Sequence, residues 1–455
     1  MSDRTTQSVL FQDPGQKPLL ARFDTESQSS DGGLVLLKQL DQGIGLTSRL
    51  AQHLIDGRQS ARVLHSSESL FQQRVFGLCA GYEDCNDSER VRSDPVMKMV
   101  SGRDATGDDS LGSQPTLSRF ENAQTGRAVV SMQQELETFV IDRVGKRHRK
   151  APTVMLDFDS TCDKGYGTQQ FLAFSGFYKS WCFLPLLGFL SVDGDPDQYL
   201  FSARLRTGTA HNTKGLLSIL RRVIPQVRKR FPKAEIRVRL DAGFATPRVF
   251  EALEEHKCKY LVGMAKNSRL DEDTDTDQIL TCLSAYLSGE SEKDFGELQY
   301  KTKSWKATRR VIYKVEALMY DGRSQRENRR YVVTNLEGTP EEIWQLYAKR
   351  GDSENRIKEL KNDLWMDRTS CRRILANQLR VLMATTAYVL FQELRWRLRR
   401  TELRRAQVHR LRNMLIKLGV RVVESTRRIV MHFSRDCPWK ETWLRVAKGM
   451  GAVPA

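Results

Sequence analysis

The chain has 455 residues, enough for about three domains and a full-sized core. Its net charge of +17 and pI ≈ 9.6 indicate a polyanionic partner, with nucleic acid first and an anionic membrane surface second. No apolar run approaches the roughly 18 residues of a membrane span, and the polar N-terminus lacks the apolar core of a signal peptide, so we expect a cytoplasmic, nucleoid-associated protein with no membrane partner. The eight cysteines are scattered without a Cys-x2-Cys pair, and we expect reduced packing residues rather than structural zinc.

The first third of the chain is predicted to hold an arm and a helical unit. Residues 1–30 are rich in Ser, Gln, Asp and Pro, which predicts a flexible arm. From 31 to 150 apolar residues recur three or four apart, which predicts a helical DNA-binding region. Within it, Ser113 begins a stretch with the form of a recognition helix, in which Arg119 is a candidate DNA contact; an ordinary capped helix fits the same pattern equally well.

Residues 151–270 alternate between strand and helix patterns. Three apolar stretches predict antiparallel strands, followed by a helix, a strand, a helix and a strand. The first strand carries Asp157 and Asp159 on one face, about 6.6 Å apart by strand rise. A later strand ends at Asp241, and Gly243 behind it allows a sharp turn. These acids are therefore candidates for a metal site.

Residues 271–338 depart from that order and predict a β-rich insertion, because the gap before the next acidic helix is too long for a plain loop. The segment begins with an acidic surface stretch. It continues in two alternating stretches that indicate a hairpin around Asp321-Gly322. Trp305 lies among several cations and is a candidate for stacking on a base, although a core tryptophan fits at least as well.

Residues 339–394 contain a stretch whose spacing predicts a helix, with acidic, basic and aromatic side chains along one face. At about 100° per residue, one narrow stripe holds Tyr347, Arg350, Glu354 and Lys361, with Lys358 close by. A carboxylate between cations suits a site at which an acid ligates a hard divalent ion and cations hold phosphate oxygens; a solvated amphipathic helix is the alternative. Residues 395–455 predict a basic C-terminal helical region that binds the DNA backbone, with a solvated basic helix as the alternative.

The spacing Tyr-x2-Arg-x3-Glu-x6-Lys on this stripe resembles, at every position, the YREK signature of DDE transposases from bacterial insertion sequences. The two strand acids and the acidic helix follow in that family's order over roughly 150–390, and the stretches GYEDCND and SQPTLSRFEN extend the resemblance toward the N-terminus. The resemblance implies an α/β fold: an RNase H-like catalytic core interrupted by a β-rich insertion. An all-α DNA-binding region would precede the core, and a helical region would follow it.

The resemblance also implies a site. Asp159, Asp241 and Glu354 would be the catalytic metal ligands. Asp157 stays open as the alternative first ligand, although the family's pattern of Asp two residues before Thr favours Asp159. Each site would bind two Mg²⁺ ions, for which Mn²⁺ substitutes, about 3.5 to 4 Å apart. By the same resemblance, the DNA would be held by Arg350, Lys361, Tyr347 and Lys358.

The activity implied is transposition. Such a protein binds the terminal inverted repeats of its insertion sequence, cleaves DNA at the element ends and joins the 3′-OH ends to target DNA by two-metal-ion phosphoryl transfer. It would act as a homodimer in the synaptic complex. One alternative is an inactive or repurposed sequence-specific DNA-binding protein. Another is a stand-alone metal-dependent nuclease, which would leave the basic regions at both ends unexplained.

Overall fold

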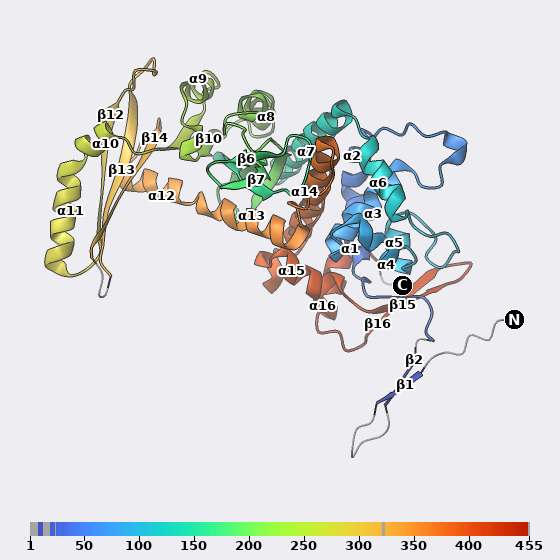
Figure 1. The fold of residues 1–455 in the computed structure, drawn as a ribbon. Coiled ribbons are helices and arrows are strands. Elements are labelled where there is room, and N and C mark those ends of the chain that lie inside the picture. The colour runs from blue at the N-terminus through green and yellow to red at the C-terminus, as the bar shows by residue number, and fades with distance from the viewer. Residues whose placement is uncertain (1–7, 12–18, 23, 321–323, 454–455) are drawn as a thin grey trace.

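The computed structural model describes residues 8–11, 19–22, 24–320 and 324–453. Figure 1 shows an elongated molecule with a bundle of helices at one end, a mixed α/β centre, and long antiparallel strands at the other end. The turn predicted at Asp321-Gly322 lies outside the described residues.

One eight-stranded mixed sheet runs through the centre, in the order β12-β13-β14-β11-β10-β4-β8-β9. Its five core strands are β4 (Thr153–Ser160), β8 (Leu186–Val192), β9 (Gln198–Arg204), β10 (Glu235–Leu240) and β11 (Lys259–Met264). Strands β4, β8 and β9 pair antiparallel, whereas β10 pairs parallel to both β4 and β11. Helices α8 (Leu216–Arg230) and α9 (Pro247–Glu255) connect β9 to β10 and β10 to β11. The α/β expectation is confirmed.

A second, smaller sheet has the order β5-β7-β6 and interrupts the connection between β4 and β8. Its strands are β5 (Asp163–Lys164), β6 (Ala173–Ser175) and β7 (Ser180–Phe183). The apolar pattern of this stretch predicts core strands, but much of its aromatic surface is exposed. Periodicity does not distinguish a buried aromatic run from an exposed one.

The predicted insertion continues the main sheet, because β14 pairs antiparallel with β11. Its strands are β12 (Glu292–Tyr300), β13 (Arg309–Leu318) and β14 (Arg326–Thr334). The stretch predicted as an acidic surface segment instead forms helices α10 (Ser268–Asp273) and α11 (Asp275–Ser288). Helix α11 buries Gln278, Thr281 and Ala285 and exposes Ile279, Leu280 and Leu283. This inverted pattern explains why hydrophobic periodicity did not predict the helix.

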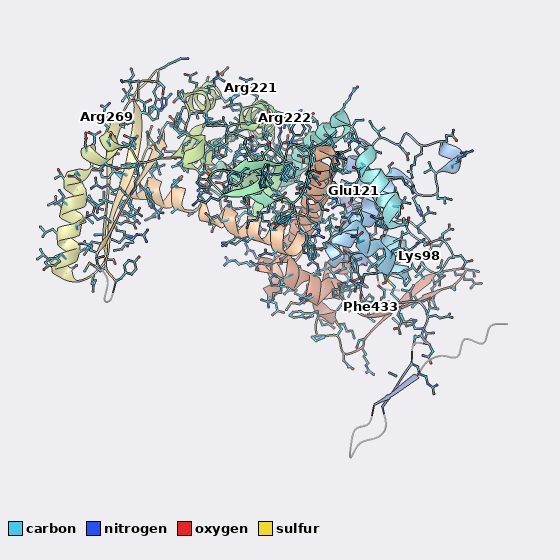
Figure 2. All side chains as sticks on the ribbon, viewed as in Figure 1. Lys98, Glu121, Arg221, Arg222, Arg269 and Phe433 are labelled. Carbon is cyan, nitrogen blue, oxygen red and sulfur yellow. The ribbon has the colours of Figure 1, made fainter. Side chains whose placement is uncertain are left out.

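The N-terminal region is helical, as the sequence predicts. Its main helices are α1 (Leu34–Ile44), α2 (Leu46–Ala51), α3 (Ser67–Ala80), α4 (Ser88–Val91), α5 (Pro95–Val100), α6 (Gln114–Ala123) and α7 (Gly126–Arg147). Helix α7 leaves the bundle and lies against the main sheet and α8. There the buried carboxylate of Glu137 accepts hydrogen bonds from Ser202 at 2.8 Å and Arg222 at 2.7 Å. Figure 2 labels Arg222 on α8. The bundle is thus joined directly to the sheet.

The C-terminal region is only partly helical. It contains α15 (Val408–Leu411) and α16 (Lys440–Gly449), but also a hairpin of β15 (Val420–Glu424) and β16 (Ile429–Phe433). The region predicted as a basic helical region therefore also contains a two-stranded hairpin. Of the segment predicted as an arm, β1 (Ser8–Phe11) pairs with β2 (Leu19–Arg22), and β3 (Gln28–Ser29) pairs with β15.

The arginines between 395 and 412 divide into a buried and an exposed group, apart from Arg397, which is partly exposed and lies 3.4 Å from Glu393. Arg395 is buried against Glu359, and Arg412 is buried where its Nε donates to the Cys79 carbonyl at 2.8 Å, at the end of α3. These two cations stabilise the fold and do not face solvent. The exposed basic surface consists of Arg399, Arg400, Arg404, Arg405 and Arg410.

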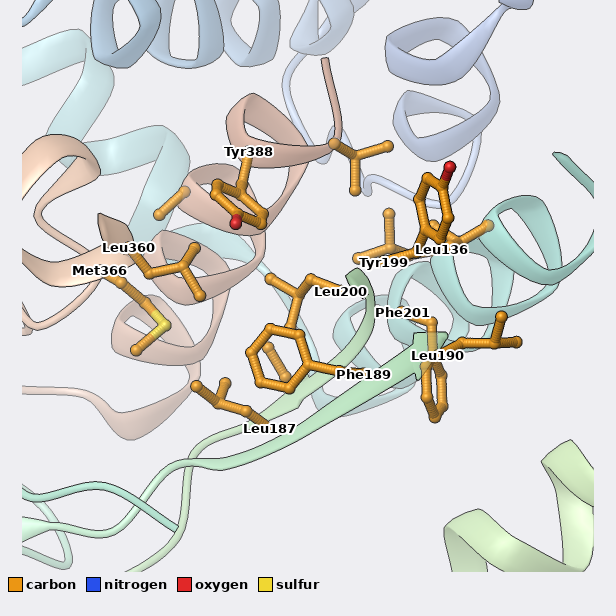
Figure 3. Packing of buried hydrophobic residues seen from close by; sticks show 14 of the residues in the cluster. Leu136, Leu187, Phe189, Leu190, Tyr199, Leu200, Phe201, Leu360, Met366 and Tyr388 are labelled. Carbon is orange, nitrogen blue, oxygen red and sulfur yellow. The ribbon is translucent and has the colours of Figure 1, made fainter. Parts of the chain in front are cut away.

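Helix α14 (Ile374–Arg397) is the central helix of the core. It packs against β9 and α7 on one side and against α3 and α1 on another. Figure 3 shows its Tyr388 near Leu360, with Phe189 and Leu200 of the sheet beside them. Among the described residues it is the one helix long and apolar enough to cross a membrane, but 89% of that stretch is buried inside the protein. Its apolar composition is therefore explained by its position in the core.

Candidate active site

Two of the expected acids lie side by side at the ends of neighbouring strands. Strands β4 and β10 pair Phe158 with Leu240, so Asp159 and Asp241 follow at equivalent positions on strands about 4.8 Å apart. Burial, with the charges of Asp241 and Glu354 adding to it, raises the pKa of Asp159 to about 6. Burial also raises the pKa of Asp241. Carboxyl groups therefore gather at one edge of the sheet.

The third acid, Glu354, comes from α13 (Gly351–Leu364), which follows α12 (Pro340–Ala348) after a short turn at Arg350. The single helix predicted here is thus two helices. Arg350 Nη1 donates to Asp159 Oδ2 at 2.8 Å, and Arg350 Nη2 lies 3.6 Å from Glu354 Oε1. Two of the acids therefore converge on one guanidinium, while the side chain of Glu354 stays 55% exposed.

The chemistry of these donors fits a hard divalent cation, because Mg²⁺ prefers carboxylate oxygens. Within the described part of the chain, no three His, Cys, Asp or Glu side chains converge as a ready cluster for an ion. The positive charge beside Asp159 comes instead from Arg350. The residues that would hold the ion are Asp159, Asp241 and Glu354.

Asp157, the alternative first ligand, is occupied elsewhere. It is 1% exposed, and its Oδ1 and Oδ2 accept hydrogen bonds from Arg239 Nε and Nη2 at 2.5 and 2.9 Å. Arg239 also donates to the Leu346 carbonyl at 2.5 Å. Asp157 thus fastens β4 to β10 and α12, and its side chain is more deeply buried than that of Asp159, which is 7% exposed.

The expected DNA-contacting residues of the stripe lie around the acids. The hydroxyl of Tyr347 occupies the space over Gly263 of β11, where a Cβ would lie only 2.4 Å from it. A glycine inside a strand is the sequence signal for such a close approach. Lys361 Nζ donates to the carbonyl of Cys162, three residues after Asp159. Lys358 is exposed on the same helix.

Trp305 is not near the acids. It is 5% exposed and packs edge-on against Phe250, with ring centroids 5.2 Å apart, while the guanidinium of Arg309 lies over it at 5.1 Å. It is a core tryptophan, as the alternative interpretation holds, and it is not available to a base.

Arg119 lies far along the chain from the acids, exposed on α6. With Arg58, Arg62 and His65 it lines a hollow of about 380 Å³ in the N-terminal bundle. The same hollow is lined by Asp56, whose carboxylate accepts hydrogen bonds from Arg58 Nε and Nη2 and neutralises part of the positive charge.

Sequence reasoning missed Arg206. Its side chain is 4% exposed just after β9, and it donates to Ser160 Oγ and to the Asn212 carbonyl, both at 2.7 Å. Burial lowers the pKa of Arg206 to about 10. The Asn212 side chain fills the space over Gly243, where a Cβ would lie 1.7 Å from Asn212 Nδ2. Gly243 is therefore required for this close packing, and its φ is not in the left-handed region.

The buried carboxyl group of Asp163 makes the free energy of unfolding depend on pH. Burial raises its pKa from 3.8 to about 8, although Thr369 Oγ1 donates to it at 2.9 Å. The folded protein keeps this proton while the unfolded chain releases it, so stability falls as pH rises from about 4 to 8, by at most about 1.4 kcal/mol per pH unit. We expect Asp163→Asn to remove this contribution and to stabilise the protein at pH 8. Urea unfolding of both proteins at pH 5, 6.5 and 8 tests it, and parallel pH profiles would contradict it.

The sequence model of the family described as Transposase DDE domain group 1 matches residues 11–454 of the chain. No curated protein sequence matches it. The family match spans the helical bundle, the sheet that carries the acids, the insertion and the C-terminal region. These parts therefore belong to one family architecture.

Proposed function

Because the chain belongs to the group 1 family of DDE transposases, we propose that it cuts and joins DNA at the ends of its own insertion sequence. It binds the terminal inverted repeats, cleaves at the element ends and joins the 3′-OH ends to target DNA. The observation that carries this proposal is the meeting of Asp159 and Glu354 on Arg350, with Asp241 on the neighbouring strand. An RNase H-like core is part of the proposal, and the sheet order β9-β8-β4-β10-β11 supports it.

Each residue of the site has a task in this reaction. Asp159, Asp241 and Glu354 hold divalent ions, Mg²⁺ or Mn²⁺, which when bound make water or a 3′-OH nucleophilic and stabilise the leaving oxygen. Arg350 neutralises the carboxylates in the free protein and offers its guanidinium to phosphate oxygens once DNA is present. Tyr347, held against Gly263, presents a fixed phenol to the DNA backbone.

The alternatives account for less of the site. Burial raises the pKa of both Asp159 and Asp241, and placing these two carboxyl groups next to each other costs folding free energy. A repurposed DNA-binding protein would gain nothing from such an arrangement. A stand-alone nuclease does not need the exposed arginines of the C-terminal region or the basic hollow around Arg119. Two ends must meet for transposition, so the working form is a homodimer, acting in the cytoplasm where bacterial DNA lies.

The test uses the purified full-length chain and labelled DNA from both borders of its gene. We expect Mg²⁺ or Mn²⁺ to produce a nick at the element terminus that leaves a 3′-OH. Chelation by EDTA should stop nicking, and an end of shuffled sequence should stay intact. Equal nicking of both DNAs would favour the nuclease, and sequence-specific binding without any nicking would favour the repurposed binding protein.

Replacing Arg350 by Ala tests its role at the phosphate. A charge-assisted hydrogen bond contributes about 1.5–3 kcal/mol, so we expect cleavage to slow roughly 10- to 100-fold. DNA affinity should change much less, because other basic residues remain. Single-turnover cleavage and a gel-shift titration measure the two effects. Arg356→Ala, which removes a cation that faces Glu359 on the same helix, is the control; an unchanged rate in Arg350→Ala would remove that residue from the site.

A further inference from the structure

Exposed aromatic side chains gather beside the acids. Eight large aromatic side chains are exposed among the described residues, and six of them fall between positions 166 and 181. Those six are Tyr166, Phe171, Phe174, Phe177, Tyr178 and Trp181. Most belong to the hairpin of β6 and β7, which we call the aromatic hairpin. Such a concentration of apolar surface marks a place that a partner covers.

The rings of the aromatic hairpin are held in fixed orientations. Phe174 and Trp181 are cross-strand partners, and their rings meet edge to face with centroids 6.1 Å apart. Phe177 and Tyr178 in the turn make a similar pair at 4.8 Å. Even so, Phe177 is 87% and Trp181 58% exposed. The rings support one another but keep free faces for a ligand.

The tip of the aromatic hairpin lies close to the acids. Ser180 Oγ at the start of β7 is 3.6 Å from Cys162 Sγ, and the Cys162 carbonyl accepts the hydrogen bond from Lys361. Burial and the charges of Asp159 and Asp241 raise the pKa of Tyr178. The hairpin therefore borders the point where the proposed function places the scissile phosphate.

The base of the hairpin is bonded to the segment that follows the Glu354 helix. Gln169 Nε2 donates to the Cys371 carbonyl at 3.1 Å, and the backbone N–H of Gln170 donates to the Arg372 carbonyl at 2.9 Å. These bonds link the hairpin to the same scaffold that carries the acids. A rigid platform loses little conformational entropy when it binds.

The chemistry of this surface fits unpaired nucleotides. Its large exposed apolar side chains are all aromatic, and Lys164 and Lys179 are exposed in the same segment. Aromatic faces stack on bases while cations hold the backbone, and stacking does not depend on sequence. The exposed face of α11, with Ile279 and Leu283, is instead mainly aliphatic. Bases inside an intact duplex are already stacked on their neighbours and leave no free face for the hairpin.

We propose that the aromatic hairpin stacks on unpaired bases of the DNA strand next to the cleavage point. The inference rests on the proposed function, because the acids bring that strand to the hairpin. The inference adds one step to the proposed reaction: the DNA end becomes locally unpaired, and the unpaired bases stack on Phe177 and Trp181. The energy of unpairing is offset by stacking.

The test compares two DNA probes without added metal, so that neither is cut. One is a blunt duplex of 20 base pairs, and the other is the same duplex with five unpaired thymidines on one strand. We expect the full-length protein to bind the second probe roughly tenfold more tightly, by fluorescence anisotropy. In Phe177→Ala/Trp181→Ala this preference should vanish while affinity for the blunt duplex stays the same. Trp181→Phe should keep most of the preference but lose the quenching of tryptophan fluorescence by the unpaired strand.

Tyr286→Ala is the matched control, because Tyr286 is an exposed aromatic residue on α11. It should bind both probes like the unaltered protein. The inference is overturned if the unaltered protein does not prefer the unpaired probe, or if the double variant keeps the preference or loses affinity for both probes equally. Cleavage of an element end by the unaltered protein is measured separately, so failure of the proposed function and failure of the hairpin are distinguishable.

Discussion

Glu354→Gln is expected to lower the rate of DNA cleavage at least about a thousandfold, equivalent to about 4 kcal/mol of transition-state stabilisation. The amide keeps the size of the side chain but removes the negative charge that a divalent ion needs. Since Glu354 is 55% exposed, the change should not affect folding. DNA binding should remain close to that of the unaltered protein, because a neutral amide repels phosphate less than a carboxylate does. Single-turnover cleavage, gel-shift titration and calorimetric Mn²⁺ binding measure the three quantities.

Asp352→Asn supplies the matched control, because it makes the same change of charge on the same helix at an exposed position outside the stripe. It should cleave normally. Two results would contradict the role given to Glu354. Normal cleavage by Glu354→Gln would remove it from the ligand set, and a joint loss of cleavage, DNA binding and thermal stability would make it a folding residue.

Helix geometry alone predicts that Glu354 and Lys361 share a face of α13, but it does not predict the break at Arg350 that leaves Tyr347 on α12. Ile357 and Leu360 are buried on a neighbouring face of α13, and Arg350 reaches Asp159 on a strand 191 residues away in the sequence. The strand positions of Asp159 and Asp241 followed from local alternation in the same way. That these two aspartates lie close together depends also on the parallel pairing of β4 with β10.

Features that depend on partners distant in sequence could not be predicted. The sequence does not reveal that Arg239 takes both oxygens of Asp157, nor that Phe250 covers Trp305. Trp181 and Trp305 each follow a Lys-Ser pair in the sequence. Only tertiary packing buries one and exposes the other. Trp305, predicted as a candidate for stacking on a base, is instead packed in the core.

Glu121→Ala is expected to destabilise the whole protein by about 3–5 kcal/mol. Glu121, which Figure 2 labels on α6, is fully buried. Its Oε1 lies 3.1 Å from Arg74 Nε of α3, and its Oε2 lies 2.7 Å from Arg380 Nε of α14. Removing the carboxylate leaves two buried guanidinium groups close together. Arg380 keeps its ion pair with Asp84 at 3.2 Å and its hydrogen bond to Ser370 Oγ at 2.7 Å. Urea unfolding at constant pH measures the loss.

The control is Glu135→Ala, which breaks a more exposed ion pair with Arg49 and should cost no more than about 1 kcal/mol. Because α14 packs on both the bundle and the sheet, we expect Glu121→Ala to shift one cooperative transition of the entire chain. A separate early transition of the bundle would show that it is an independent domain. A single transition would mean that the bundle and the sheet unfold as one cooperative unit, held together by α14.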